Sequence, residues 1–366
     1  MALHAPTLTV DLNALCANYR QLKAHHVQGR IAAVVKADAY GLGMVSVAQA
    51  LSRQTQCSEF FVATLEEAIR LRAALPQASI YVFAGVLRGE EADYLAHHLS
   101  PVLNTIPQLE RWRAARLSAL DLGRPVASAA LHVDTGMCRL GLSVEDVPKI
   151  HPASVTNECG VDLLMSHLAC ASEPDHCLNN EQLSLFQHAR QFFPELRASL
   201  ANSSGLFLDA SYHMDLGRPG CALYGITPNP ALPNPMQPVV TWTAPILQIR
   251  TVERDQPIGY GATMTVTRGM KVATLASGYA DGLHRSASPH LAAWIDDYRC
   301  PMLGRVSMDL TCYDVTEVPE AVLETTDDLT LMGPHQSVDQ VADAYGTIGY
   351  EVLCHLGQRL QRCYVE

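Results

Sequence analysis

The stretch Ile31-Ala-Ala-Val-Val-Lys36-Ala-Asp-Ala-Tyr40-Gly-Leu-Gly43 sets the fold of the first half of the chain. Its apolar run, Ile31–Val35, predicts a short buried strand. The glycines at 41 and 43 predict a turn, and the segment after them predicts a helix. A strand, a turn and a helix in this order form one β/α unit of a parallel sheet.

This unit recurs up to about residue 225. The further apolar runs that predict strands are Phe60–Ala63, Ile80–Ala84, Pro101–Asn104, Ser128–Asp134, Val161–Ser166 and Leu196–Ala201. The segment His213–Tyr224 can hold an eighth strand. Helix starts are readable at Asp11 and at Thr64, where Glu67 completes a capping box. Eight strand–helix units in this length predict a (β/α)₈ barrel of the TIM type.

The composition of the sequence changes at residues 228–238, which contain five prolines. Because so many prolines fit neither a helix nor a central strand, this segment is predicted to be a linker. The runs that follow predict a mostly β domain and a late helix: Val239–Val252, Lys271–Ala276, Ser307–Val315 and the helical Val338–Tyr345. We expect a barrel over 7–230 and a C-terminal domain over 239–366, and we allow for the segment 1–10 packing with the latter.

Composition excludes several classes of protein. The 366 residues hold 26 Lys and Arg against 37 Asp and Glu, and a formal net charge of −11 argues against a general affinity for nucleic acid or anionic membranes. Eleven cysteines without a C-x-x-C pair, and histidines without H-E-x-x-H, give no reason to expect a disulfide framework or a metal. The first ten residues lack the pattern of a signal peptide and no later stretch would span a bilayer, so we expect a cytoplasmic protein.

Lys36 is the first candidate catalytic residue. The chain has only four lysines, and Lys23, Lys149 and Lys271 lie in segments with an ordinary solvent-facing interpretation. Lys36 instead follows the first strand, at the barrel face where such folds hold their active sites. A partly desolvated amine there has a lowered pKa and forms an imine with a carbonyl. From position alone, a lysine that only extends its amine to solvent is an equal alternative.

A phosphate site is predicted at the same face. Barrels of this type bind phosphate in the loops after strands 7 and 8. The seventh run ends in Asn202-Ser203-Ser204-Gly205, and near the eighth lies Leu216-Gly-Arg218-Pro-Gly220-Cys221. Each alone reads as an ordinary turn, and a dinucleotide fingerprint at Gly41 is weak because its third glycine position is Ser46. Together with a strand-end lysine, the two loops indicate pyridoxal 5′-phosphate (PLP) as cofactor.

At this point the motifs resemble those of alanine racemases, PLP enzymes built of a barrel and a β domain. The resemblance begins with the Lys36 stretch quoted above and continues through both halves of the chain. The matching motifs are Asp134-Thr-Gly-Met-Cys-Arg139-Leu-Gly, Ser166-His167-Leu-Ala, Asn202-Ser203, Arg218-Pro-Gly220, Gly259-Tyr260-Gly-Ala-Thr, Gly278-Tyr279-Ala-Asp-Gly, Gly304-Arg305-Val-Ser-Met308-Asp309 and Gly349-Tyr350-Glu.

The resemblance implies an isomerase that interconverts L- and D-alanine by a two-base mechanism and supplies D-alanine for peptidoglycan of the cell wall. Lys36 would hold PLP and, once freed, act as the base on the D face of the substrate Cα. Tyr260, supplied by the partner subunit of a homodimer, would act on the L face. A phenol is a poor base at neutral pH, and His167 with Arg218 would form a hydrogen-bonded chain to it.

Further roles come from the same resemblance. Arg218 would face the pyridine nitrogen and leave it unprotonated, because a guanidinium does not readily release a proton. The residues implied to hold the cofactor phosphate are Tyr40, Ser203, Gly220, Cys221 through its backbone N–H, and Tyr350. The substrate carboxylate would be bound by Arg139 and the backbone N–H of Met308. The active-site entrance would be lined by Tyr279, Arg285 and Arg305, and no residue is expected to bind a metal.

His132 departs from the family pattern. Many relatives have a lysine there that becomes carbamylated and orients the arginine equivalent to Arg139, and histidine cannot form that stable carbamate. Our hypothesis is that Arg139 is held by His132 itself, by a neighbouring amide or by a bound anion such as chloride. Asp38 and Leu42 also differ from many relatives, with no effect that the sequence predicts. Taken singly, His167 reads as a core histidine, Tyr279 as a turn residue and Asp309 as a turn cap.

Alternative functions stay open at this stage. A racemase of broader amino-acid scope, or a decarboxylase, could use the same architecture, and a non-catalytic PLP-homeostasis protein would keep the barrel and the lysine without a second base. The β domain that carries Tyr260 argues against the last of these. The breadth of specificity and a biosynthetic or catabolic role are not decided by any motif.

Overall fold

The computed structural model describes residues 5–26 and 29–366, which form two compact units. The barrel unit comprises Leu15–Leu223 and Thr227–Met236. The C-terminal unit comprises the described residues up to Ala14, Tyr224–Ile226 and Gln237–Glu366. We allowed for the segment 1–10 packing with the second domain. The first four residues of this segment lie outside the described residues.

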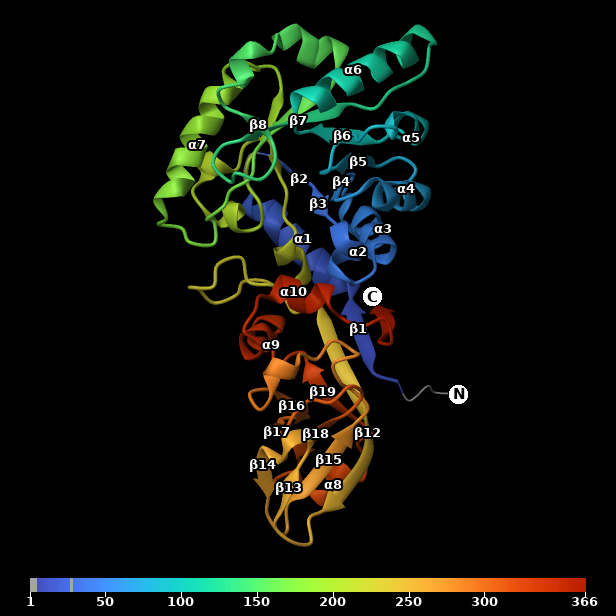
Figure 1. Cartoon of the computed structure of the whole chain (residues 1–366), viewed down its shortest axis with the longest axis vertical. Helices are drawn as coiled ribbons and strands as arrows, with labels where there is room; N and C mark the ends of the chain where they lie inside the picture. Colours follow the sequence, from blue (N-terminus) through green and yellow to red (C-terminus); the bar gives the residue numbers. More distant parts are fainter. Residues whose placement is uncertain (1–4, 27–28) are drawn as a thin grey trace. The chain divides into compact units, whose positions relative to one another are not determined.

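The barrel unit is built on a parallel sheet whose first strand is in two pieces, β2 (Arg30–Ile31) and β3 (Ala33–Val34). The sheet order is β3-β4-β5-β6-β7-β9-β10, with the short β8 (Leu142–Ser143) paired to β7, and helices lie outside the strands (Figure 1). The remaining strands are β4 (Glu59–Val62), β5 (Ser79–Val82), β6 (Ser100–Leu103), β7 (Ala129–Asp134), β9 (Val161–Met165), β10 (Arg197–Ser199) and β11 (Leu216–Gly217).

Strand β11 closes this sheet on itself. It pairs in parallel with β2, and the N–H of Ala32 donates to the carbonyl of Gly217 at 2.9 Å. On its other side the N–H of Asp215 donates to the carbonyl of Ala198 at 3.0 Å, next to β10. Each of the predicted apolar runs contributes to this ring, and the predicted barrel is confirmed.

Core packing and helix caps follow from the same sequence pattern. Helix α1 (Leu12–His25) is capped by Asp11, whose carboxylate accepts from the N–H of Ala14 at 2.9 Å, and α4 (Leu65–Ala74) has the predicted capping box of Thr64 and Glu67. The other helices are α3 (Met44–Thr55), α5 (Glu91–Ala96), α6 (Ile106–Asp121) and α7 (Cys177–Arg190). The barrel interior is filled by Ala32, Val34, Phe61, Tyr81, Val102, Ala130, Leu163, Met165 and Leu216.

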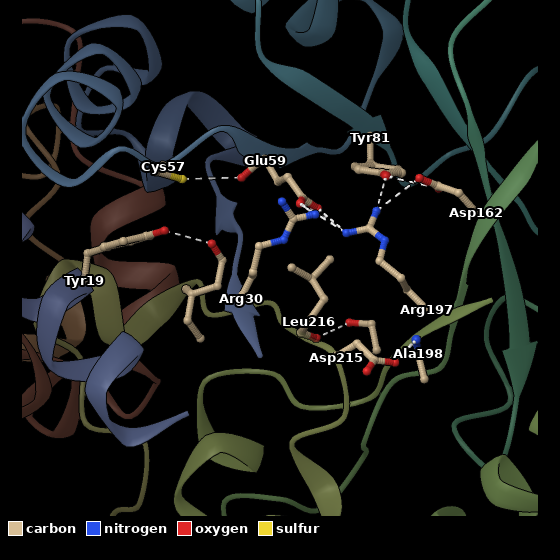
Figure 2. Close-up of polar contacts among 12 residues, drawn as sticks. Tyr19, Arg30, Cys57, Glu59, Tyr81, Asp162, Arg197, Ala198, Asp215 and Leu216 are labelled. Carbon is tan, nitrogen blue, oxygen red and sulfur yellow. Dashed lines mark hydrogen bonds and ion pairs between the residues drawn. The ribbon is translucent and has the colours of Figure 1, made fainter. Parts of the chain in front are cut away.

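An ion-pair network occupies the amino-terminal end of the barrel strands. Glu59, at the start of β4, is 5% exposed and pairs with Arg30 at 2.5 Å and with Arg197 at 3.1 Å (Figure 2). Arg197 also contacts Asp162 and the hydroxyl of Tyr81, both at 3.1 Å. These side chains come from separate strands, so the network holds the end of the barrel opposite Lys36.

The C-terminal unit is also a closed β structure. Its sheet runs β15-β18-β17-β16-β19-β12-β1-β20, and an additional pairing of β15 with β12 closes six of these strands into a ring. The strand β1 (Thr7–Asp11) pairs with β12 and β20. The other strands are β12 (Val240–Thr251), β13 (Gln256–Ile258), β14 (Met264–Val266), β15 (Lys271–Leu275), β16 (Ala292–Ile295), β17 (Tyr298–Leu303), β18 (Thr311–Asp314), β19 (Asp328–Met332) and β20 (Gln361–Val365).

Three helices accompany these strands: α8 (Glu320–Leu323), α9 (Val338–Tyr345) and α10 (Gly349–Cys354). The helix α9 has the bounds predicted for it, with a capping box formed by Ser337 and Gln340. Within residues 5–26 and 29–366, no helix combines the length and apolar character needed to cross a bilayer.

Candidate active site

Lys36 begins α2 (Lys36–Tyr40) and is separated from β3 by Val35 alone, and this element is a left-handed turn. From Ala37 (φ 52°) to Tyr40 (φ 57°), every residue has a positive φ without being glycine. Such residues cost roughly 1–2 kcal/mol each, so the surroundings must hold the turn in place. Glu67 does so, because its two carboxylate oxygens accept from the N–H of Ala37 at 2.6 Å and of Ala63 at 2.8 Å.

Asp38 supports the other end of this turn. One oxygen of its carboxylate accepts from the N–H of Met44, the first residue of α3, at 3.1 Å and from Arg70 at 3.3 Å. The turn ends at Gly41 (φ 81°), where a glycine carries no Cβ penalty. The structure thus gives Asp38 a role that the sequence did not predict.

The amine of Lys36 lies at the carboxyl end of the first strand, as predicted. Its Nζ is 5.7 Å from the centroid of the Phe83 ring, and Phe83 itself packs against the barrel core. The Lys36 side chain is half-buried. An amine beside an aromatic ring, on a turn held by Glu67 and Asp38, has the surroundings expected of a nucleophile rather than those of a surface lysine.

The residues predicted to hold phosphate in the barrel unit form one cradle. The buried Ser203 hydroxyl accepts from the N–H of Gly220 at 2.9 Å and from that of Ala222 at 3.2 Å. Cys221, also buried, lies between these two donors in sequence. A Cβ at Gly220 would lie 2.4 Å from the Tyr40 hydroxyl, so only glycine lets the phenol approach this loop.

Arg218 is a buried cation at the end of β11, only 3% exposed. Its guanidinium donates to the carbonyl of Ser166 and to the hydroxyl of Ser199. Burial lowers the pKa of Arg218 to about 9, which leaves it charged at neutral pH. A buried charge among the strand ends of the barrel can interact with a ring nitrogen or with an anion.

His167 follows β9 and is neutral. Burial, and next the charge of Arg218, lower the pKa of His167 to about 3. Within the described residues, no hydrogen bond joins the His167 ring to Arg218. The hydrogen-bonded chain from these two residues to Tyr260 therefore stays a prediction.

Arg139 lies on an exposed loop that Asp134 shapes. One oxygen of the Asp134 carboxylate accepts from the N–H groups of Gly136 and Met137, each at 2.9 Å, and of Cys138 at 3.2 Å. The Arg139 guanidinium has no hydrogen bond or ion pair with any residue of 5–26 or 29–366. The direct support by His132 or an amide that we considered is not formed in this structure.

The site residues predicted in the C-terminal unit are all exposed. Tyr260 opens a short 3₁₀ turn, Tyr260–Ala262, and its side chain is 71% exposed. A Cβ at the next residue, Gly261, would lie 3.0 Å from the guanidinium of Arg305. The Arg305 side chain therefore packs closely against the turn that carries Tyr260. The further exposed members of the predicted set are Tyr279, Arg285, Arg305, Met308 and Tyr350.

Two loops of this unit are fixed by contacts that the sequence did not reveal. Arg359 donates to both oxygens of the buried Asp281, each at 2.9 Å, and to Asp309 at 2.7 Å. The N–H of Ala280 donates to the carbonyl of Met308 at 3.0 Å. Asp281 and Asp309 lie inside motifs that match the family, and this match was the only feature of the sequence that pointed to them. Their partner Arg359 lies outside every such motif.

The barrel residues fit PLP. They provide an amine for an aldehyde, a serine hydroxyl and a tyrosine phenol beside a glycine loop for a phosphate, and a buried cation. The absence of a Cβ at Gly220 lets the Tyr40 hydroxyl lie directly against this loop. Nucleophile, phosphate donors and cation are the groups that this cofactor requires of a protein.

Comparison with known proteins agrees with this geometry. A model of the alanine racemase N-terminal domain matches residues 10–228, and one of the alanine racemase C-terminal domain matches residues 239–364. The chain belongs to the alanine racemase family.

Relatives within this family cover nearly the whole chain. A catabolic alanine racemase of Mesorhizobium japonicum is 48% identical over 98% of this chain and 93% of its own length. An alanine racemase of Acidiphilium cryptum is 45% identical over 98% of this chain and 99% of its own. A crystal structure of alanine racemase from Bartonella henselae with covalently bound pyridoxal phosphate matches with a TM-score of 0.89, at 34% identity and 99% coverage of both chains.

Proposed function

We propose that this chain interconverts L- and D-alanine by a two-base mechanism in which Lys36 and Tyr260 act on opposite faces of the substrate. Racemisation of alanine and the PLP cofactor follow from membership of the alanine racemase family. The observation that carries the proposal for individual residues is that Tyr40, at the end of the turn that begins at Lys36, lies against Gly220 of the Ser203–Gly220 cradle.

The cofactor would be held mostly by the barrel unit. Lys36 would bind its aldehyde carbon, and Tyr40, Ser203, Gly220 and Cys221 would hold its phosphate. Tyr350 of the C-terminal unit would add a hydroxyl donor. Arg218 would face the pyridine nitrogen, and as a permanent donor it would keep that nitrogen unprotonated. When bound, PLP withdraws electrons from the substrate Cα and so makes its proton removable.

The two bases would move one proton each. The Lys36 Nζ would remove the Cα proton of D-alanine or return one to that face. The phenol of the partner subunit's Tyr260 would do the same on the L face. The order is reversed for L-alanine, because removal from one face and return to the other is what inverts the centre. His167 and Arg218 would assist Tyr260, whose unperturbed phenol is a weak base at neutral pH.

Substrate selection would lie with the remaining residues. Arg139 and the backbone N–H of Met308 would hold the substrate carboxylate, which suits a guanidinium fork. Tyr279, Arg285 and Arg305 would line the entrance. The small methyl side chain of alanine fits an entrance narrowed by Tyr260 and Tyr350.

A homodimer is part of this proposal, since Tyr260 would serve the partner's site. The support is the 71% exposure of Tyr260 on the described chain. We further propose a cytoplasmic location and supply of D-alanine for peptidoglycan; a deletion strain that grows without added D-alanine would contradict the supply role.

Mixing two inactive variants tests the shared site. Lys36→Ala and Tyr260→Phe homodimers would each be inactive, whereas a hybrid dimer has one site with neither defect. Random reassortment after mild dissociation would restore about a quarter of wild-type activity in a two-fold symmetric dimer. Each variant alone, taken through the same dissociation, is the control. A mixture that stays inactive while the hybrid is shown to form would contradict the shared site.

A further inference from the structure

We propose that Gln182, on α7, is a positioning residue for His167: its side-chain amide fixes the backbone that directs the imidazole ring. The inference rests on the proposed function of His167, which would assist Tyr260 on the L face of the substrate. It goes further by naming a residue that sets the direction of His167 from the outer helix. Gln182 lies outside the motifs that match the family.

The Gln182 amide makes two hydrogen bonds to the loop after β9. Its Oε1 accepts from the N–H of Ala169 at 2.8 Å, and its Nε2 donates to the carbonyl of His167 at 2.8 Å. A backbone N–H can only donate and a carbonyl can only accept, so these two partners leave the amide one orientation. The amide thus holds the backbone on both sides of Leu168, which is itself buried.

Hydrogen bonds fix both peptide groups that flank the His167 Cα. The carbonyl of Ser166, on one side, accepts from the buried guanidinium of Arg218. The carbonyl of His167, on the other side, accepts from Gln182. Each residue has two soft backbone dihedral angles, and both are set when the two adjoining peptide planes are held. The direction of the His167 Cα–Cβ bond therefore depends on Arg218 from one side and on Gln182 from the other.

Gln182 is held in place by its surroundings. Its side chain is fully buried, and the second hydrogen of Nε2 donates to the Thr135 hydroxyl at 3.2 Å. That hydroxyl lies 2.7 Å from the hydroxyl of Ser166, and Thr135 and Ser166 are each 1% exposed. Because the Thr135 oxygen accepts from Gln182, its own proton is available to Ser166. The amide oxygen and both amide hydrogens of Gln182 thus have partners, which makes this side chain a rigid support.

The direction of the ring decides what His167 can do for Tyr260. Burial, and next the charge of Arg218, lower the pKa of His167 to about 3, so the ring is neutral at pH 7. A neutral imidazole carries one N–H and one lone pair, on different nitrogens. Such a ring relays a proton only when each nitrogen faces its own partner, and a rotated backbone would move both nitrogens.

The base on the D face is supported separately. Lys36 begins a turn whose backbone N–H groups are bound by Glu67 and Asp38. Loss of the Gln182 amide should therefore slow proton transfer on the L face and leave the D face intact. This selectivity distinguishes a positioning residue for His167 from a residue that only stabilises the barrel.

Gln182→Met tests this selectivity, because methionine has a similar length and makes none of the three hydrogen bonds. The PLP-loaded variant is incubated in D₂O with each enantiomer of alanine, and proton NMR follows the initial loss of Cα hydrogen. We expect L-alanine to lose it about tenfold more slowly than with the wild type, the scale of one hydrogen bond, and D-alanine to stay within about threefold. Equal slowing for both enantiomers, or none, would overturn the inference.

Asn179→Leu is the matched control. Asn179 is a buried amide on the same helix, and its Nδ2 donates to the carbonyl of Glu173 at 2.9 Å, further along the same loop. Its loss should lower the free energy of unfolding in urea without separating the two enantiomers. If Asn179→Leu slowed L-alanine selectively to the same degree, the effect would not be specific to Gln182 and the inference would be overturned.

A crystal structure of the PLP-loaded wild-type enzyme gives a test that does not depend on the folding of a variant. The Gln182 amide should lie within hydrogen-bond distance of both the His167 carbonyl and the Ala169 N–H. An amide turned away from either group would overturn the inference.

His167→Phe, measured in parallel, separates this inference from the function on which it rests. If His167→Phe slows L-alanine selectively and Gln182→Met does not, only the role of Gln182 is contradicted. If His167→Phe leaves both rates at those of the wild type, the assistance that His167 gives to Tyr260 is contradicted, and the inference with it.

Discussion

Gly220 lies directly beside the Tyr40 hydroxyl, so closely that a Cβ at Gly220 would come within 2.4 Å of that oxygen. The contact joins the loop after β11 to the turn that begins at Lys36. Tyr40 is buried at the end of a left-handed turn. A displacement of its side chain away from Gly220 would therefore also shift the turn that carries Lys36. A change at Gly220 is therefore expected to disturb both the proposed phosphate cradle and the turn that carries Lys36.

Gly220→Ala tests this coupling. The added methyl group would displace the Tyr40 phenol and weaken the proposed phosphate cradle, so we expect PLP affinity to fall at least tenfold. The measurement is the titration of the apoenzyme with PLP, followed by the absorbance of the bound cofactor. Gly123→Ala is the control for backbone strain alone, since its φ of 68° disfavours alanine while its Cβ would meet no atom within 4 Å, and its PLP affinity should match that of the wild type. Equal affinity in Gly220→Ala and wild type would refute the coupling.

Glu67 tests the support of the left-handed turn. Glu67→Ala removes the acceptor for two backbone N–H groups and breaks the capping box of α4, so we expect about 2 kcal/mol of lost stability and weaker PLP binding. Urea unfolding and PLP titration measure the two effects. The neighbouring, exposed Glu66→Ala is the matched control. Similar results for both variants would show that the turn does not depend on Glu67.

The ion-pair network at the amino end of the barrel strands contributes to stability rather than to catalysis. Glu59→Gln leaves Arg197 and Arg30 without their shared carboxylate, and we expect a loss of about 2–3 kcal/mol, reduced by the exposure of Arg30. Folded enzyme should keep the wild-type KM for alanine, because the network lies at the end opposite Lys36. Thermal unfolding and steady-state kinetics measure the two properties. A changed KM with unchanged stability would reverse this assignment.

The neutral buried histidines predict a loss of stability in acid. His132 and His167 have pKa values lowered to about 4 and about 3, below the ordinary value of 6.5 that applies when the chain is unfolded. Below pH 6.5 the unfolded chain binds protons that the folded chain does not. Stability is therefore complete above pH 6.5 and falls as the pH drops toward 4, by up to about 1.4 kcal/mol per pH unit for each histidine.

His132→Gln checks this pH dependence. The variant has one titrating group fewer, so its unfolding free energy should fall less steeply between pH 6.5 and 4.5 than that of the wild type. Urea unfolding at fixed PLP and protein concentration gives the two slopes. Parallel slopes would mean that His132 titrates normally in the folded protein.

The sequence predicts the barrel well because each strand is a short apolar run and each repeat is closed by a local signal. The capping box at Thr64 and the helix Val338–Tyr345 are local features of this kind. The left-handed turn at Lys36 could not be predicted in the same way. It contradicts the propensity of Ala37 and is maintained by Glu67, thirty residues away. The sequence pattern contains no signal for such a partner.

The candidate site was likewise predictable only in part. The residues in matching motifs could be named, but not the contacts that hold them. Arg359 fixes the loops of Asp281 and Asp309 from a position outside every motif, and Asn104 fixes the His132 ring from a neighbouring strand. Strands β13, β16, β17 and β19 were not predicted either; β19 pairs with β12, a segment distant in sequence, whereas β13–β14 and β16–β17 are local hairpins whose strands were missed.

Deuterium exchange in the Tyr260→Phe variant tests the two-base mechanism most directly. The PLP-loaded variant is incubated in D₂O with L-alanine and, separately, with D-alanine, and both racemisation and Cα deuterium are measured. We predict that racemisation is lost in both directions while D-alanine alone gains deuterium, through Lys36. Deuterium in both enantiomers, or racemisation at the wild-type rate, would contradict the assignment of Tyr260 as the base on the L face.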